Sequence, residues 1–67
     1  MRVHDVKTFA ERKPFRPFAV RLTNGSEYQF NEARDLGAPR DFHMIFHFGK
    51  SEAVRIETSS IVEIIEN

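Results

Sequence analysis

The segment Arg16-Pro-Phe-Ala-Val-Arg-Leu-Thr-Asn-Gly-Ser-Glu-Tyr-Gln-Phe30 decides the fold, because it predicts a β-hairpin with one acceptable register. Asn24-Gly25 between two alternating apolar runs is typical of a hairpin turn. A two-residue loop would put Tyr28 and Val20 on opposite faces, since a slip of one residue moves a strand's side chains to the other side of the sheet. We therefore predict a three-residue loop that pairs Val20 with Tyr28 and ends at Gly25 with positive φ, where glycine meets no Cβ clash.

Apolar periodicity predicts the remaining elements. Val3, Val6 and Phe9 recur at helical spacing, and Pro14 ends the helical pattern. The alternation of Phe42, Met44, Phe46 and Phe48 with polar or aliphatic neighbours predicts a strand. The full set of expected elements is a helix over 3–12, hairpin strands over 18–22 and 28–30, a helical turn over 31–36 capped by Asn31 and ended by Gly37, and strands over 42–48, 54–57 and 62–66, with a 3₁₀ turn over 58–60 before the last.

These elements predict an α+β, mainly β fold. An N-terminal helix precedes a five-stranded antiparallel sheet, which must bend strongly or form a small, partly open barrel to cover its core. The order of elements resembles the SH3-like and Sm-like small barrels. We expect a buried core in which Phe46→Ala costs about 3–5 kcal/mol. Its members are Phe9, Phe18, Val20, Tyr28, Phe30, Met44, Phe46, Val54, Ile56, Val62 and Ile64.

Length and composition restrict the class of protein. The chain has 67 residues, so we expect one domain over 1–67, close to the lower size limit for independent stability. It has no cysteine, and no apolar run is long enough to span a membrane. These features predict a cytoplasmic protein without a signal peptide or membrane contact. The formal net charge is zero, which favours self-association by weakening repulsion between copies.

The first half of the chain also carries a recognisable pattern. Arg12-Lys-Pro-Phe-Arg-Pro-Phe18, followed by Leu22-Thr-Asn-Gly25 and Tyr28-Gln-Phe30, resembles a family of short, uncharacterised bacterial proteins. Many members of that family have His-Pro-Glu after the second strand, whereas this chain has Asn31-Glu-Ala33, so it lacks that histidine. The resemblance implies no activity for this chain.

A possible interface is predicted on the strand over 42–48. His43, Ile45 and His47 alternate with the expected core residues, and an apolar Ile45 between two histidines indicates a face covered by another element or subunit. The two histidines lie about 13 Å apart on a strand that rises ~3.3 Å per residue, too far to bind one metal ion. We therefore expect a homo-oligomer, most simply a dimer, with no metal or other cofactor.

The alternative function is weak nucleic-acid binding of the Sm-like kind. Basic residues interleaved with aromatic residues are typical of surfaces that bind nucleic acids. The neutral net charge and the absence of any nucleophile–base or metal motif favour a non-enzymatic interaction module that self-associates, without catalytic residues or a specified protein partner. The basic residues of the alternative are Lys7, Arg12, Lys13, Arg16 and Arg21.

Overall fold

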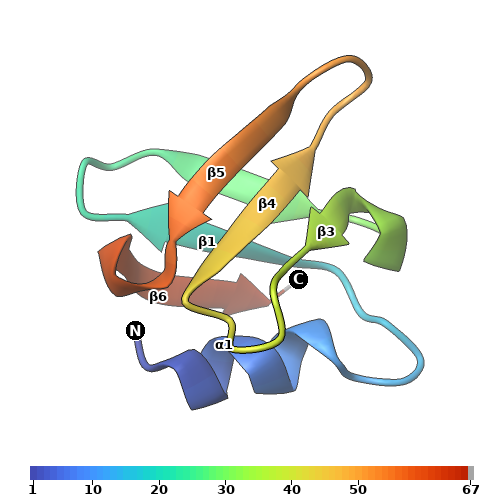
Figure 1. Ribbon diagram of the computed structural model, residues 1–67, viewed down its shortest axis with the longest axis horizontal. Coiled ribbons are helices and arrows are strands. Elements are labelled where there is room, and N and C mark those ends of the chain that lie inside the picture. Colours follow the sequence, from blue (N-terminus) through green and yellow to red (C-terminus); the bar gives the residue numbers. More distant parts are fainter. Residues whose placement is uncertain (67) are drawn as a thin grey trace.

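The computed structural model describes residues 1–66 and shows one α-helix with two three-stranded antiparallel sheets (Figure 1). The strand orders are β2-β1-β6 and β3-β4-β5, and the two sheets are not joined into one closed barrel. Among the described residues, no helix is both long and apolar enough to cross a membrane. The elements are α1 (Val3–Ala10), β1 (Phe18–Leu22), β2 (Glu27–Phe30), η1 (Ala33–Asp35), β3 (Leu36–Gly37), β4 (Met44–Phe48), β5 (Ala53–Glu57), η2 (Thr58–Ser60) and β6 (Ile61–Glu66).

The β1–β2 hairpin confirms the predicted register. Val20 pairs with Tyr28, and Phe18 pairs with Phe30. The Leu22 N–H donates to the Ser26 carbonyl at 2.8 Å, which closes a three-residue loop. Gly25 ends this loop with φ 88°, the left-handed conformation that a side chain would disfavour.

Helix α1 closes one end of the core beneath β1 and β6 (Figure 1). Val6 is fully buried, and Phe9 packs against the buried cluster. The ring of Phe18 lies 5.8 Å from that of Phe9 and 5.2 Å from that of Phe30, measured between centroids. The helix ends at Ala10, one turn before Pro14, and is therefore shorter than predicted.

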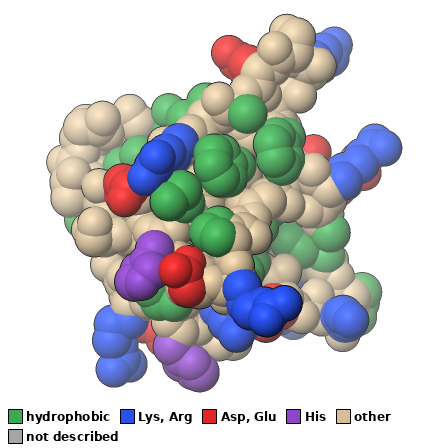
Figure 2. Space-filling view, viewed as in Figure 1, with side chains coloured by type: hydrophobic (Ala, Val, Ile, Leu, Met, Phe, Trp, Pro, Cys, Tyr) green, Lys and Arg blue, Asp and Glu red, His purple; other side chains and the backbone are tan. Residues whose placement is uncertain are grey.

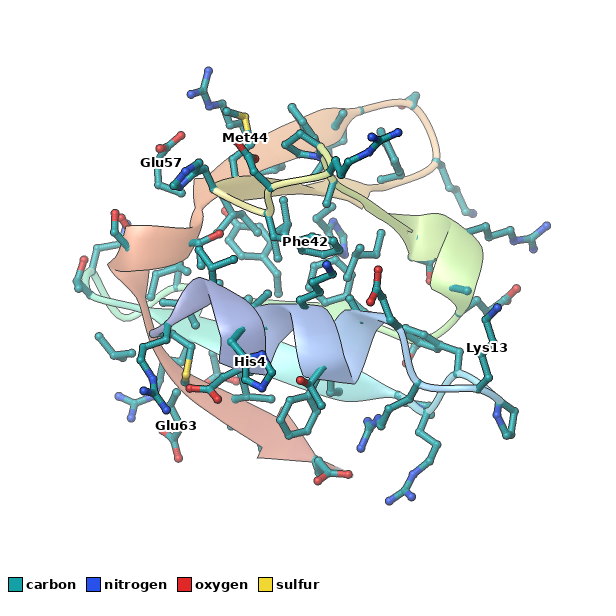
Figure 3. The ribbon with its side chains drawn as sticks, turned by 60° about the horizontal axis from the view of Figure 1, so that its bottom comes forward. His4, Lys13, Phe42, Met44, Glu57 and Glu63 are labelled. Atoms are coloured by element: carbon teal, nitrogen blue, oxygen red, sulfur yellow. The ribbon has the colours of Figure 1, made fainter. Side chains whose placement is uncertain are left out.

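The strand predicted over 42–48 begins only at Met44. Phe42 has φ 53° and its N–H donates to the Pro39 carbonyl, so the chain turns there before it becomes extended. Thr58 holds this turn from η2, because its buried hydroxyl donates to the Phe42 carbonyl at 2.6 Å. Phe42 itself points into the interior, between α1 and the second sheet (Figure 3).

The segment after β2 differs from the prediction of one helical turn that Asn31 caps and Gly37 ends. Glu32 is the N-cap of a single 3₁₀ turn, and its N–H is bonded by the Asp35 side chain in a capping box. Gly37 lies in β3, a short strand in addition to the five predicted, and β3 pairs with β4. A Cβ at Gly37 would lie 2.6 Å from the Phe48 ring, so a larger residue there would require that ring to move; the glycine does not form the predicted left-handed turn.

The predicted core is wrong on two strands. On β4 the buried residue is Ile45, with no exposed surface, whereas Met44 and Phe46 are only half-buried and do not belong to the core cluster. On β6 the buried residue is Ile61, and Val62 is 49% exposed. The register of β1 with β6 shifts between Arg21 and Leu22, and this irregularity turns Val62 outward. The buried hydrophobic residues are Val6, Phe18, Ala19, Val20, Phe30, Phe42, Ile45, Ile56 and Ile61.

Candidate interaction surface

His43, Ile45 and His47, the predicted interface residues, do not form an exposed face of β4. Ile45 lies in the core, opposite Ile56, so it cannot meet a second copy. His47 is half-buried, and its Nε2–H donates to the Gln29 carbonyl at 3.0 Å. Of the three residues, only His43 is exposed.

Aromatic and apolar side chains instead occupy the outer face of β4. Met44, Phe46 and Phe48 alternate with buried Ile45, and Phe48 is 43% exposed. The Phe46 and Phe48 rings stack at 6.3 Å between centroids with an interplanar angle of 11°. Hydrophobic side chains gather over this face (Figure 2), and Met44 points away from the interior (Figure 3). Met44 and Phe46 are partly exposed on this face, and Phe48 is the most exposed of the three.

Strand β5 adds two opposite charges to the same face. Arg55 lies opposite Phe46 in the ladder, and Glu57 lies opposite Met44. The Arg55 Nε donates to Glu57 Oε2 at 2.7 Å, although both side chains remain about half exposed, at 59% and 49%. Glu57 points outward beside Met44 (Figure 3). The charges are therefore accessible to a partner as well as to each other.

The free edge of β5 borders this face. Strand β5 is the last strand in the order β3-β4-β5. The Gly49 N–H donates to the Glu52 carbonyl, and the Thr58 N–H donates to the His43 carbonyl. These two residue pairs are therefore hydrogen-bonded pairs at the two ends of the β4–β5 ladder. Bonded pairs alternate along an antiparallel ladder, so the N–H groups of Arg55 and Glu57 point away from β4. The β4–β5 surface is defined here as Met44, Phe46, Phe48, Ala53, Arg55 and Glu57.

Sequence reasoning missed the β4–β5 surface although a signal was present. A four-residue turn over 49–52 pairs Phe46 with Arg55 and Ile45 with Ile56. Placing both Phe46 and Ile56 in the core is inconsistent with that pairing, because residues on the same face must lie opposite one another. The turn length therefore contained the information needed to place Phe46 outside.

The basic residues of the nucleic-acid alternative are largely engaged within the chain. Arg12 and Arg16 both bond Glu66 Oε2, at 2.8 and 3.2 Å. Arg21 pairs with Glu63 through its guanidinium group. Lys7 on α1 and Lys13 in the following linker are exposed and have no ion pair among the described residues. The structure therefore does not gather these five residues into one free basic surface.

Glu66, the last residue of β6, has a lowered pKa because two arginines lie beside it. The hydrogen bond from Arg12 holds the pKa of Glu66 below its usual value, and the positive charges of Arg12 and Arg16 add to this effect. Arg12 also lies over the Phe9 ring, 4.6 Å from its centroid. This cluster joins the linker after α1 to the last strand.

A polar hollow of about 460 Å³ lies between η1, β2 and the β4–β5 turn. His47 and Asp35 line it, but His47 is bonded to Gln29 and Asp35 caps η1. Its lining contains no serine, threonine, tyrosine or cysteine that could act as a nucleophile. Within residues 1–66, no group of three or more acidic or histidine side chains has the arrangement of a metal site.

Comparison of the chain with protein-family models, with curated proteins and with solved structures gives no significant match.

Proposed function

We propose that the protein is a small non-enzymatic interaction module that self-associates through the β4–β5 surface. The observation that carries this proposal is the apolar outer face of β4 beside the unpaired edge of β5. Unpaired strand edges are templates for pairing, and natural proteins commonly block them with charged side chains, especially lysine, with proline or with a bulge. Strand β5, with the sequence Ala-Val-Arg-Ile-Glu, has no proline, lysine or bulge, and its two charged residues, Arg55 and Glu57, have opposite signs.

Size and charge support self-association. The fully buried core consists of a few side chains, and a chain of 67 residues is close to the lower limit for independent stability. Burial of further apolar surface against a second copy would add stabilisation, because the hydrophobic contribution scales with the area removed from water. The zero formal net charge leaves little long-range repulsion between copies.

We also propose that the fold is a split version of a small SH3-like or Sm-like barrel. Supporting this is the pairing of the last strand, β6, with the first, β1, after the 3₁₀ turn η2. Strand β3 pairs with β4 just after β2 ends, as a continuation of β2 broken by η1 would do. The proposal concerns the arrangement of strands and carries no activity with it.

The mass in solution tests the proposed function. Sedimentation equilibrium from low to high micromolar concentration should show a reversible monomer–dimer equilibrium. Phe46→Ser tests the apolar face and Arg55→Pro tests the edge, since an edge strand tolerates proline where its N–H faces solvent. At least one of these variants should shift the equilibrium toward monomer.

Val62→Ser is the matched control, because Val62 is an exposed apolar residue on β6, away from the β4–β5 surface. It should associate like the wild type. A wild-type monomer mass at high micromolar concentration overturns self-association, and an equal loss in Val62→Ser overturns its assignment to this surface. Retention on heparin that falls with added salt would support the nucleic-acid alternative instead.

A further inference from the structure

The outward edge of β5 carries opposite charges at successive positions. Arg55 and Glu57 are separated by one residue, so their side chains share the outer face and their N–H groups share the free edge. In residues 1–66, neither of these two N–H groups takes part in a hydrogen bond outside the strand ladders. The free edge of β5 therefore presents the two unused N–H donors of Arg55 and Glu57 beside one positive and one negative side chain.

We infer that two copies of the chain pair antiparallel along β5, about a twofold axis at Ile56, so that Arg55 of each copy faces the partner's Glu57. This inference rests on the proposed self-association and specifies its partner, a second copy, and its register. Because β5 ends at Glu57 and is followed by η2, the paired segment is Arg55–Glu57 of each copy, where the edges of the two β3-β4-β5 sheets meet. A twofold contact uses the same patch on both copies, which is the simplest closed assembly.

Charge complementarity selects this register. Residues with outward N–H groups must lie opposite one another, which leaves twofold axes at Val54, Arg55 or Ile56. An axis at Arg55 places two guanidinium groups directly opposite, and like charges in that position are destabilising. An axis at Val54 places Arg55 opposite Ala53 and pairs no charges. Only the axis at Ile56 forms two opposite-charge pairs, Arg55 with Glu57 and the reverse.

The surroundings of β5 leave this edge accessible. Figure 1 shows β5 at the margin of its sheet, with the turn after β4 projecting at one end and η2 at the other. Ala53, Arg55 and Glu57 are all exposed. The intrachain bond between Arg55 and Glu57 does not prevent the pairing, because each side chain is about half exposed and can exchange partners at the edge.

Disulfide trapping tests the register directly, since the chain has no cysteine of its own. Arg55→Cys and Glu57→Cys are prepared separately and oxidised mildly, alone and as a mixture. Residues directly opposite in an antiparallel pair have Cα atoms about 5.5 Å apart, within the range that a disulfide spans. We expect crosslinked dimer in the mixture, little in either variant alone, and none with the control Glu63→Cys on β6.

The outcomes separate this inference from the proposed function. Crosslinking of Arg55→Cys alone would place the axis at Arg55 and overturn the register. A wild-type dimer that gives no crosslink in the mixture would overturn edge pairing while leaving self-association intact. A wild-type monomer would overturn both.

A charge exchange tests the two salt bridges independently. Arg55→Glu and Glu57→Arg each place like charges opposite one another in a homodimer, so each should raise the dimer Kd by about tenfold or more. Mixing the two variants restores opposite charges at both positions and should return the Kd toward that of the wild type. The intrachain pair is absent from both variants, so recovery in the mixture reports contacts between copies. Failure to recover would overturn the pairing of Arg55 with the partner's Glu57.

Discussion

The hairpins β1–β2 and β4–β5 have similar lengths, yet the phenylalanines of the first are buried and those of the second are partly exposed. In β1–β2, Phe18 and Phe30 lie opposite one another and are fully buried. In β4–β5, Phe46 lies opposite the exposed Arg55, and Phe48 lies opposite the exposed Ala53. Strand β4 carries apolar side chains on both faces, whereas the register of β1–β2 places its large apolar side chains on one face, which is the face that is buried.

The comparison shows that alternation alone does not tell which face of a strand is inside. Three large apolar residues on β4 point outward, and one, Ile45, points inward. The inward residue, Ile45, lies opposite the large apolar residue Ile56, whereas Met44 and Phe46 lie opposite the charged residues Glu57 and Arg55. Cross-strand pairing therefore decides the buried face better than the number of apolar residues on each side does.

The largest expected effect compares the two faces of β4. Ile45→Ala should lower the free energy of unfolding by about 2–5 kcal/mol, because it leaves a cavity in the core. Phe46→Ala should lower it by about 1 kcal/mol, since that ring is only half-buried and outside the core cluster. Urea unfolding at low protein concentration measures both, away from any contribution of dimerisation. A larger loss for Phe46→Ala would restore the original assignment of the faces.

A second prediction concerns the turn that starts β4. Thr58→Val should cost about 1–3 kcal/mol, because it removes the buried hydroxyl that donates to the Phe42 carbonyl and leaves that carbonyl unpaired. Thr58→Ser keeps the hydroxyl and serves as the matched control. Thermal unfolding followed by circular dichroism measures both variants, and equal melting temperatures would show that this hydrogen bond does not hold the turn.

The turn of the β1–β2 hairpin gives a smaller effect. Gly25→Ala should destabilise by about 1 kcal/mol or more, because alanine disfavours the positive φ at that position. Gly49→Ala in the β4–β5 turn is the control. There the added methyl group meets the flexible Glu52 side chain at 3.3 Å and no positive φ is required, so we expect a smaller loss. Denaturant midpoints of the two variants in the reverse order would contradict the requirement for positive φ at Gly25 in the three-residue loop.

The smallest effect is the pH dependence contributed by Glu66. Its pKa is lowered in the folded state, so the ionised carboxylate stabilises the fold above its unfolded pKa and this stability is lost as pH falls through the folded pKa. The wild type should therefore lose more stability than Glu66→Gln between about pH 5 and pH 3. Glu27→Gln, on a carboxylate with no ion pair in the described part of the chain, should follow the wild-type curve. Parallel curves for all three proteins would remove Glu66 from the acid response.

The candidate surface was predictable only in part. The strand predicted over 54–57 is observed as β5 (Ala53–Glu57), and the structure places it at the edge of its sheet. The predicted interface residue Ile45 is buried, so the face beside that edge consists of Met44, Phe46 and Phe48 instead. Where β6 pairs with β1, the register shifts between Arg21 and Leu22, so Ile61 is buried in place of the predicted Val62. No local sequence pattern predicts such an irregularity.

Local sequence by itself determined the helix near the N-terminus, the β1–β2 register and the 3₁₀ turn before the last strand, because turn chemistry and one-sided apolar patterns act over a few residues. Only the tertiary structure decided that Ile45 is inside, that Gly37 lies in the additional strand β3, and that Glu63 and Glu66 form ion pairs with three of the arginines. These features depend on segments far apart in sequence that meet only when the two sheets pack, and burial of apolar surface is non-directional until that packing selects a face.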